Sequence, residues 1–211
     1  MEKKIGIIGT GNMGKALGKL LAGHNYEVFL GSRDPEKGKQ IAEELGANVQ
    51  GGSIVEAAEF GGIVILAVHY AVVAEALAAA GPLAGKTVID IVNPLTPDFS
   101  GLAVGYTSSA AEETAALIPG ATVVKAFNYA FDSTFQNENA FSPEKPTMFY
   151  CGDDADAKAD IDMIISDIGF DPVDAGPLQN ARYLEPLAML IIQLGFSQKM
   201  GTGIAFKLLR R

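Results

Sequence analysis

A glycine-rich turn near the amino terminus constrains the fold of this 211-residue chain more than any other feature. The segment KIGIIGTGNMG begins with an apolar run, passes through Gly9, Gly11 and Gly14, and leads into a helical pattern. In a G-x-G-x-x-G motif the first glycine permits a tight turn, the second lets the backbone approach a pyrophosphate, and the third lets helix and strand pack closely. Its place between a predicted strand and a predicted helix indicates a dinucleotide-binding βαβ unit. The alternative is a tight turn with a purely structural role, because the chain contains 24 glycines.

Short apolar runs alternate with alanine-rich helical patterns along the first part of the chain. This alternation is typical of an α/β protein in which helices cover both faces of a parallel sheet. We predict strands at 4–9, 27–31, 47–50, 63–68, 87–92 and 122–127, and helices near 12–23, 35–45, 53–60, 70–80 and 108–118. Six strands in this rhythm predict a doubly wound Rossmann sheet with the strand order 3-2-1-4-5-6.

The pattern changes in the last third of the chain. The segment 128–148 is polar, aromatic and contains proline, which predicts an irregular connection over a surface or pocket. A strand at 148–152, a helix at 155–168, a short strand at 171–174 and an apolar helical stretch at 178–196 are predicted to follow. We therefore expect a dinucleotide-binding Rossmann domain over 1–130 and a small C-terminal α/β domain over 131–211 that holds an acceptor site and dimerises.

Composition excludes several classes of protein. Hydrophobic residues make up 48% of the chain and charged residues 19%, which indicates a globular protein. The net charge of −9 argues against a nucleic-acid partner, because phosphate backbones require clustered cations. The single cysteine, Cys151, excludes an internal disulfide and a cysteine-based metal cluster. Lys3 and Lys4 lead directly into the first strand, and the apolar stretch 187–196 is too short to span a bilayer, so we expect a cytoplasmic protein without a membrane partner.

The end of the second predicted strand carries the next signal, in the stretch GSRDPEK. A unit that holds an unmodified adenosine ribose usually carries a carboxylate here, whereas this chain has Ser32 and Arg33, with Lys37 one helical turn later. A 2′-phosphate is repelled by a carboxylate and attracted by Arg, Lys and hydroxyl donors, so these residues favour NADP over NAD. The alternatives are that the cations decorate a solvated helix start, or that Asp34 faces a ribose hydroxyl.

With these residues in view, the chain resembles the NADP oxidoreductase, coenzyme F420-dependent family. Two segments carry the resemblance: GTGNMGKALGKLLAGHNYEVFLGSRDPEK near the start, and DAGPLQNARYLEPLAMLII near the end. The resemblance covers nearly the whole chain, and it implies a small cytoplasmic protein, commonly a homodimer, that passes a hydride between NADPH and the deazaflavin F420. The cytoplasmic domains of membrane ferric reductases look similar in the Rossmann part.

The resemblance also implies which residues hold the nucleotide. Residues 10–13 would line the pyrophosphate, residues 32, 33 and 37 would hold the 2′-phosphate, and residues 68–70 and 93–94 would flank the nicotinamide. The implied cofactor-binding set is Gly9, Thr10, Gly11, Asn12, Met13, Gly14, Ser32, Arg33, Lys37, Val68, His69, Tyr70, Asn93 and Pro94.

Two departures from the family pattern leave the hydride acceptor open. Members tend to carry a Pro-Trp pair where this chain has His69 and Tyr70, and its VVKAFN segment (123–128) looks more like the ferric-reductase relatives. The expected function is hydride transfer between NADP(H) and F420 or a related deazaflavin or flavin. The alternatives are an NADPH-dependent ferric or flavin reductase, and a non-catalytic NADP-binding module that senses redox state.

Few side chains are candidates for chemistry, because the cofactors of a hydride transfer carry the reaction while the protein aligns them. His69 follows a strand end, where ligands bind in open α/β sheets, and we expect it to align the nicotinamide; the alternative is a neutral, hydrogen-bonded imidazole beside a helix start. Asn128 is the candidate substrate residue, with a turn role as its alternative. The apolar stretch around Met189 predicts a core or interface helix and hence a homodimer. No metal site is expected.

Overall fold

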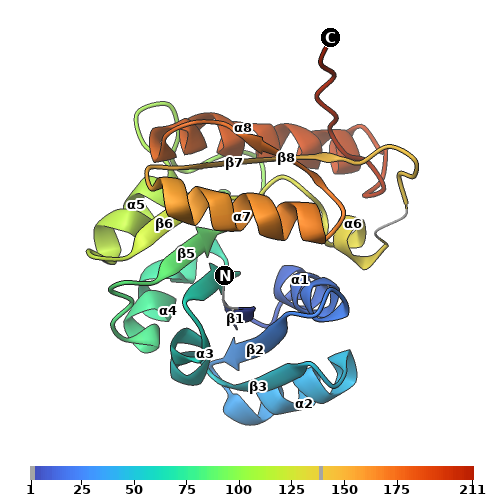
Figure 1. Cartoon of the computed structure of the whole chain (residues 1–211). Coiled ribbons are helices and arrows are strands. Elements are labelled where there is room, and N and C mark those ends of the chain that lie inside the picture. Colours follow the sequence, from blue (N-terminus) through green and yellow to red (C-terminus); the bar gives the residue numbers. More distant parts are fainter. Residues whose placement is uncertain (1–2, 138–139) are drawn as a thin grey trace.

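The computed structural model describes residues 3–137 and 140–211. Within these residues the strands form one eight-stranded sheet in the order β3-β2-β1-β4-β5-β6-β7-β8, with helices on both faces (Figure 1). The strands are β1 (Lys4–Ile8), β2 (Glu27–Ser32), β3 (Val49–Ser53), β4 (Ile63–Leu66), β5 (Thr87–Asp90), β6 (Thr122–Lys125), β7 (Thr147–Gly152) and β8 (Asp171–Asp174). The helices are α1 (Asn12–Gly23), α2 (Pro35–Leu45), α3 (Ile54–Phe60), α4 (Val73–Ala80), α5 (Ala110–Leu117), α6 (Asp132–Gln136), α7 (Ala155–Asp167) and α8 (Ala181–Ile192). Shorter turns of 3₁₀ helix are η1 (Tyr70–Val72) and η2 (Leu178–Asn180), and the π-helical turn η3 (Gln193–Ser197) extends α8.

The strands β1 to β6 are parallel and follow the order 3-2-1-4-5-6, which confirms the predicted Rossmann sheet. All four residues of β4 are buried, because helices cover the sheet on both sides. Strands β4, β5 and β6 each end two residues before the predicted position. At β5 the cause is visible: the Asp90 carboxylate accepts the N–H of Val92 at 2.8 Å, which turns the backbone out of the strand ladder.

A hydrophobic core lies on each face of the sheet. One core packs side chains of α1, α2, α6 and α7, including Leu17, Phe135 and Ile161, against one face. The other packs α3, α4 and α5, including Leu77 and Ala111, against the opposite face. Helix α8 contributes to both cores, so it is joined to the Rossmann part by apolar contacts on two sides of the sheet.

The C-terminal part extends the same sheet. Strand β7 pairs with β6 in the antiparallel direction, and β8 then pairs with β7 in parallel. The predicted boundary at residue 130 is therefore not marked by a break in the sheet, and the division into two domains stays a prediction. The predicted irregular connection 128–148 contains the short helix α6, and its residues 138 and 139 lie outside the described residues.

The amino-terminal ends of the helices differ in how their free N–H groups are satisfied. Side chains cap α2, α3, α5 and α7, through Asp34, Ser53, Ser109 and Asp154 respectively. At α1 the cap position is Gly11, which has no side chain to accept a hydrogen bond. Helices α4, α6 and α8 also lack a side-chain cap. At the start of α1 the free N–H groups can be satisfied by a bound anion.

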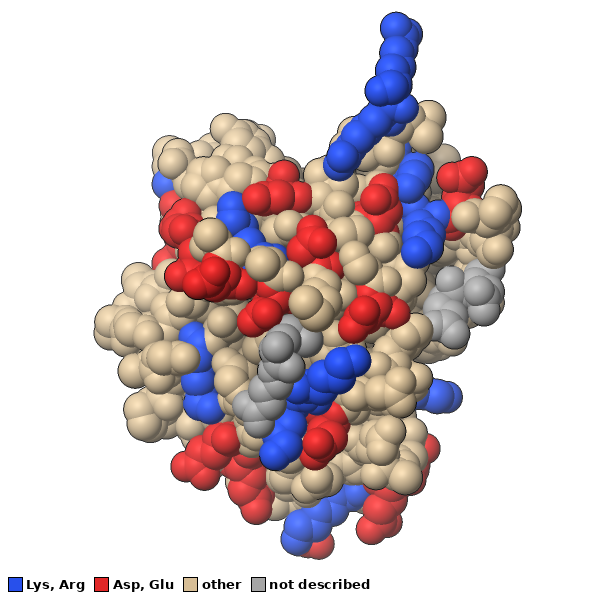
Figure 2. Space-filling view, viewed as in Figure 1, with Lys and Arg blue, Asp and Glu red and all other residues tan. Residues whose placement is uncertain are grey.

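Charged side chains of both signs cover the face of the molecule shown in Figure 2. Acidic groups gather over α7, and basic side chains extend along the C-terminal tail. On this face the described residues present no continuous cationic surface of the kind that a nucleic-acid backbone requires. None of the helices within 3–137 and 140–211 is both long enough and apolar enough to cross a membrane.

Candidate functional site

A cleft of about 880 Å³ opens at the carboxyl ends of β1, β2, β4 and β5. Ligands of open α/β sheets bind at this edge, where the strand order reverses between β1 and β4. The predicted residues that line the cleft are Gly9, Thr10, Gly11, Asn12, Met13, Ser32, Arg33, Lys37, Val68, His69 and Asn93. Residues that the sequence had not suggested also line it, among them Glu75 and Val92. Most of the predicted set is therefore brought together at one site.

The glycine turn explains the shape of the floor of this cleft. Gly9 has φ of +121°, and a Cβ there would lie 2.2 Å from the carbonyl oxygen of Ala67. A Cβ on Gly14 would lie 2.1 Å from the carbonyl oxygen of Gly9, so Gly14 serves the packing of α1 on the strand behind the cleft. At Gly11 a Cβ would meet nothing within 4 Å, because the space in front of it is the cleft. The turn thus leaves room for a ligand to touch the backbone.

The uncapped start of α1 faces this space. Gly11, Asn12 and Met13 line the cleft, and they include the cap position and the first residues of α1. The free N–H groups and the positive end of the helix dipole favour a phosphate group here. The donor set therefore fits a pyrophosphate, with no side chain required to neutralise it.

The end of β2 forms the outer part of the cleft. Ser32 is buried and its Oγ accepts the N–H of Asp34 at 3.3 Å, whereas Arg33 and Lys37 are exposed. Arg33 Nη1 lies 3.8 Å from the Oε1 of Glu75 across the cleft, and both side chains are more than half exposed. Such an exposed pair is weak, so the guanidinium is available to an anionic ligand.

Asp34 has a structural task at this end of the cleft. Its Oδ1 accepts the N–H groups of Glu36 at 3.1 Å and Lys37 at 3.4 Å, and it caps α2. A carboxylate engaged in this way is held by the helix rather than directed at a ribose hydroxyl. The residues beside it that can meet a 2′-phosphate are a hydroxyl and two cations.

The inner end of the cleft lies beyond β4 and β5. His69 is exposed and occupies the cap position of η1. Tyr70 points elsewhere: its hydroxyl donates to Glu113 at 2.7 Å, and burial together with that carboxylate raises the pKa of Tyr70 to about 12. Pro94 is buried behind the lining, so two of the residues expected near a nicotinamide lie outside the cleft surface.

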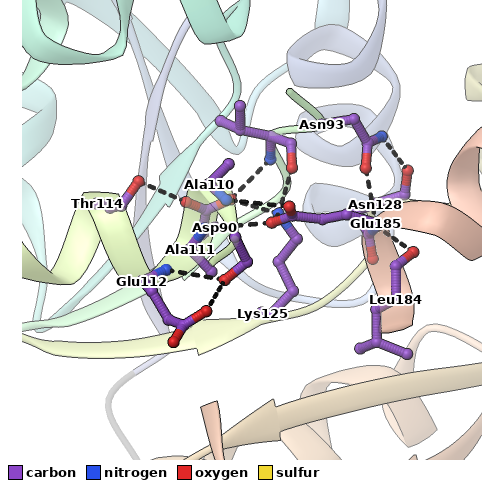
Figure 3. Close-up of polar contacts among 12 residues, drawn as sticks. Asp90, Asn93, Ala110, Ala111, Glu112, Thr114, Lys125, Asn128, Leu184 and Glu185 are labelled. Carbon is purple, nitrogen blue, oxygen red and sulfur yellow. Dashed lines mark hydrogen bonds and ion pairs between the residues drawn. The ribbon is translucent and has the colours of Figure 1, made fainter. Parts of the chain in front are cut away.

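Asn93 lines the inner end and is fixed by a second asparagine. Its Nδ2 donates to the backbone oxygen of Asn128 at 2.6 Å, and its Oδ1 accepts from the Nδ2 of Asn128 at 2.9 Å (Figure 3). Asn128 itself is only 5% exposed and does not line the cleft. The role of Asn128 in holding a substrate directly stays a prediction, and its observed contacts are with Asn93 and with α8.

Beneath the inner end lies a buried charged cluster that the sequence analysis missed. The Nζ of Lys125 lies 2.9 Å from the Oδ1 of Asp90 and 2.9 Å from the Oε1 of Glu185, and it also donates to the backbone oxygen of Val92 (Figure 3). The second oxygen of Asp90 accepts from Thr114 at 2.7 Å. All three charged side chains are at most 1% exposed, so every charge is held by protein groups alone.

Glu185 connects this cluster to two helices. From α8 its carboxylate accepts the N–H groups of Ala110 at 3.0 Å and Ala111 at 3.2 Å, which are the first residues of α5. Burial raises the pKa of the Glu185 carboxyl, although Lys125 opposes the shift. Burial alone would lower the pKa of Lys125, but the attraction of the two carboxylates outweighs it and raises the pKa.

A local signal for this cluster was present in the sequence. Lys125 interrupts the apolar run TVVKAF, and Glu185 begins the apolar stretch EPLAMLII. A single charge inside a buried element needs a partner, because Lys and Glu are almost never buried alone. The two residues lie 60 positions apart, so the pattern indicates that partners exist without saying which they are.

The chemistry that this site supports is binding and alignment. The cleft offers backbone donors for a pyrophosphate, cations for a further phosphate and an oriented amide at its inner end. The charged groups beneath are buried away from the cleft and paired with each other. This arrangement suits a reaction whose chemistry is carried by the bound cofactor.

Known proteins show similarity along the whole chain. Residues 4–94 match the family described as NADP oxidoreductase, coenzyme F420-dependent. The F420-dependent NADP reductase of Methanothermobacter marburgensis is 32% identical over 213 residues, which cover 93% of this chain and 94% of that protein. The metalloreductase STEAP3 of Rattus norvegicus is 29% identical over 189 residues, and this match covers 90% of this chain but only 37% of the longer rat protein. A crystal structure of a proposed F420-dependent NADP reductase from Arthrobacter sp. FB24 superposes with a TM-score of 0.88 over 100% of both chains, at 29% identity.

Proposed function

The chain belongs to the NADP oxidoreductase, coenzyme F420-dependent family of oxidoreductases, and from this premise we propose that it transfers a hydride between NADP(H) and coenzyme F420 or a related deazaflavin or flavin. One observation carries the nucleotide half of the proposal. The uncapped start of α1 and the cationic end of β2 line the same cleft. Both features attract phosphate groups. A dinucleotide with a 2′-phosphate carries phosphate on both sides of its adenosine, in the pyrophosphate and at the 2′ position.

The residues of the chain have distinct tasks in this reaction. Residues at the start of α1 bind the pyrophosphate through backbone N–H groups, and Ser32, Arg33 and Lys37 bind the 2′-phosphate. Val68, His69 and Asn93 surround and orient the nicotinamide at the inner end. NADPH, when bound, supplies the hydride. The protein contributes alignment and exclusion of water, so no side chain needs to act as an acid or base.

A matched pair of glycine variants tests the nucleotide site. In Gly11→Ala the added methyl group meets nothing of the protein within 4 Å, but it occupies the cleft where the backbone would approach the pyrophosphate. In Gly23→Ala the methyl group also meets nothing within 4 Å, at the far end of α1. We expect Gly11→Ala to raise the Kd for NADPH at least tenfold and Gly23→Ala to leave it unchanged, measured by fluorescence titration. Equal effects of the two variants would contradict the proposed site.

The acceptor is tested by steady-state oxidation of NADPH. Three reactions contain F420, FMN with a ferric chelate, or no added acceptor, each with a matched reaction that lacks the protein. We expect rapid oxidation with F420. Oxidation with FMN and ferric chelate alone would favour the second candidate below, and tight NADPH binding without oxidation in any reaction would overturn the enzymatic proposal.

An NADPH-dependent ferric or flavin reductase is the second candidate. It is favoured by the similarity to a metalloreductase over 90% of this chain, at 29% identity. The chain spans about 37% of that relative, so the activity of the longer protein is not carried over as a whole. Under this alternative the nucleotide cleft is unchanged, and only the second substrate differs.

We also propose that the protein is a homodimer with α8 at its interface. An apolar groove of about 520 Å³ lies between residues 102–106 and α8, and two of its lining residues, Tyr106 and Leu190, are at least half exposed. Exposed apolar surfaces of this kind are typical of interfaces. We expect Leu190→Glu to give a monomer mass by light scattering at micromolar concentration, and the tail variant Leu209→Glu to keep the dimer mass. A monomer mass for the unmodified protein would contradict the proposal.

A further inference from the structure

We propose that Asn128 is a positioning residue that fixes the side chain of Asn93 at the nicotinamide end of the cleft, and that α8 holds Asn128 in place through the backbone oxygen of Leu184. The inference deepens the proposed function and rests on it, because it assigns a task to a residue that does not line the cleft. It also gives α8 a part in nucleotide binding, although α8 lies outside the cleft lining.

The two asparagines form a reciprocal pair. Asn93 donates from Nδ2 to the backbone oxygen of Asn128 at 2.6 Å and accepts at Oδ1 from the Nδ2 of Asn128 at 2.9 Å (Figure 3). An amide group has two N–H donors and two lone pairs on its oxygen. Each end of the Asn93 amide therefore keeps one unused hydrogen-bonding position, and its plane is set before any ligand arrives.

The hydrogen bonds of Asn128 define which way its own amide faces. Its Nδ2 donates both N–H groups, one to Asn93 and one to the backbone oxygen of Leu184 at 2.9 Å. Its Oδ1 is buried and has no hydrogen-bond partner among the described residues. The reverse orientation would place this oxygen against two acceptors, so only the observed one is favourable. Asn128 is thus required for its donors: a side chain without them would leave the Oδ1 of Asn93 without its partner, and only the bond from Nδ2 to the backbone oxygen of residue 128 would still hold Asn93.

The backbone beside Asn93 is held from the same region of α8. The N–H of Val92 donates to Asp90, and its carbonyl oxygen accepts from Lys125. Lys125 is held in turn by Glu185, the residue that follows Leu184. Two consecutive residues of α8 therefore fix both the backbone and the side chain at the inner end of the cleft.

The consequence is a preformed amide site for the nicotinamide carboxamide. A carboxamide and the free positions of the Asn93 amide are complementary, since each offers a donor and an acceptor. A group that is already oriented does not lose conformational freedom when its ligand binds, which strengthens binding. Loss of Asn128 should therefore weaken binding of the whole dinucleotide and leave binding of its adenosine half unchanged.

The experiment compares two ligands on one variant. Asn128→Asp keeps the size of the side chain but places carboxylate oxygens against Asn93 and Leu184. We expect the Kd for NADPH to rise at least tenfold by calorimetric titration, while the Kd for adenosine 2′,5′-bisphosphate stays within twofold. Asn48→Asp is the matched control, because Asn48 is exposed and also donates to a backbone oxygen, that of Ala22 at 3.4 Å; we expect neither Kd to change.

A second background tests whether Asn128 acts through Asn93. In Asn93→Ala, the further change Asn128→Asp should alter NADPH binding less than threefold. If Asn128→Asp does not fold, Asn128→Ala replaces it with the same measurements. The inference would be overturned by an equal loss of affinity for both ligands, by unchanged NADPH binding, or by failure of both variants to fold. An unmodified protein that does not bind NADPH would instead overturn the proposed function itself.

Discussion

The two ends of the cleft are built in opposite ways. At the outer end the cations are exposed side chains: Arg33 has 77% of its side chain in solvent and only a 3.8 Å contact with Glu75. At the inner end Asn93 is hydrogen-bonded to the buried Asn128, and the charged side chains beneath this end are at most 1% exposed. Under the proposed function, the outer end selects the nucleotide by charge, whereas the inner end holds the nicotinamide by geometry.

The requirements of the two ends explain this difference. Attraction between a phosphate and a guanidinium falls slowly with distance, so mobile side chains serve it well. Hydride transfer requires the reacting atoms to be held near contact in a fixed orientation, and small displacements reduce the rate steeply. The buried charges, whose desolvation is unfavourable, therefore lie where a side chain must be held in position. The exposed charges lie where attraction of a phosphate is sufficient.

The largest expected effect tests the buried end. Lys125→Met leaves Asp90 and Glu185 buried without their cation, and we expect the free energy of unfolding to fall by about 3–5 kcal/mol, measured by urea denaturation. The control is Lys39→Met, which removes an exposed lysine paired with Glu36 at 2.8 Å; we expect its unfolding midpoint to stay close to that of the parent. Similar small decreases in the free energy of unfolding for both variants would contradict the distinction between the buried inner end and the exposed outer end.

A second test concerns the residue at the inner end that is exposed. His69→Ala should lower turnover by about tenfold to a hundredfold through lost alignment, without changing NADPH affinity greatly. The pH dependence of turnover should be the same in the unmodified protein and in His69→Ala, because the proposed task of His69 is alignment rather than proton transfer. Complete loss of activity with normal NADPH binding would make His69 a proton donor. The inner end would then take part in the reaction in addition to positioning the ligand.

The third test concerns the outer end. We expect the unmodified protein to bind NADPH at least tenfold more tightly than NADH, because of Ser32, Arg33 and Lys37. Arg33→Asp should erase or invert this preference, since it replaces an attraction by a repulsion. Its thermal unfolding should match that of the parent because the side chain is exposed. Equal dissociation constants for the two nucleotides in the unmodified protein would contradict selection by charge.

The smallest expected effect concerns the solvent edge of the buried cluster. Arg182 on α8 binds Glu112 on α5 through two hydrogen bonds of 2.9 Å and 2.6 Å, and the arginine lowers the pKa of Glu112. A lowered pKa gives stability that is present above the ordinary pKa of glutamate and is lost as the pH falls through the folded-state value. The difference in unfolding free energy between the parent and Arg182→Met should therefore be largest near neutral pH and vanish in acid. A difference that grows in acid would contradict this assignment.

The outer end and the sheet could be read from local sequence. Apolar strands, the spacing of Gly9, Gly11 and Gly14, and the cations after β2 are all local patterns, and the order of β1 to β6 follows from the rules for parallel sheets. The end of β5 was predicted two residues too late, because apolarity alone does not show that the Asp90 carboxylate accepts the N–H of Val92 and ends the strand. The antiparallel entry of β7 depends on a connection with no regular pattern.

The inner end depended on contacts between distant parts of the chain. Asn93 and Asn128 were both recognised at strand ends, but their pairing requires the register of β5 against β6. Glu185 meets Lys125 only because α8 returns across the sheet. Each of these residues can be recognised in the sequence as a polar residue in or beside an apolar segment. The sequence does not show which of these polar residues contact one another. The arrangement of the inner end could therefore be described only from the structure.

Under the proposed function, the uncapped start of α1 makes the nucleotide a component of the folded protein as well as its substrate. Four other helices close their amino-terminal ends with their own side chains, whereas the start of α1 has no side-chain cap and lines the cleft. Binding to the folded chain alone stabilises it by about 2.7 kcal/mol when the free ligand is at roughly 100 times its Kd. We therefore expect the lifetime of the protein against proteases to follow the size of the dinucleotide pool, so that a cell depleted of cofactor also loses the enzyme that consumes it.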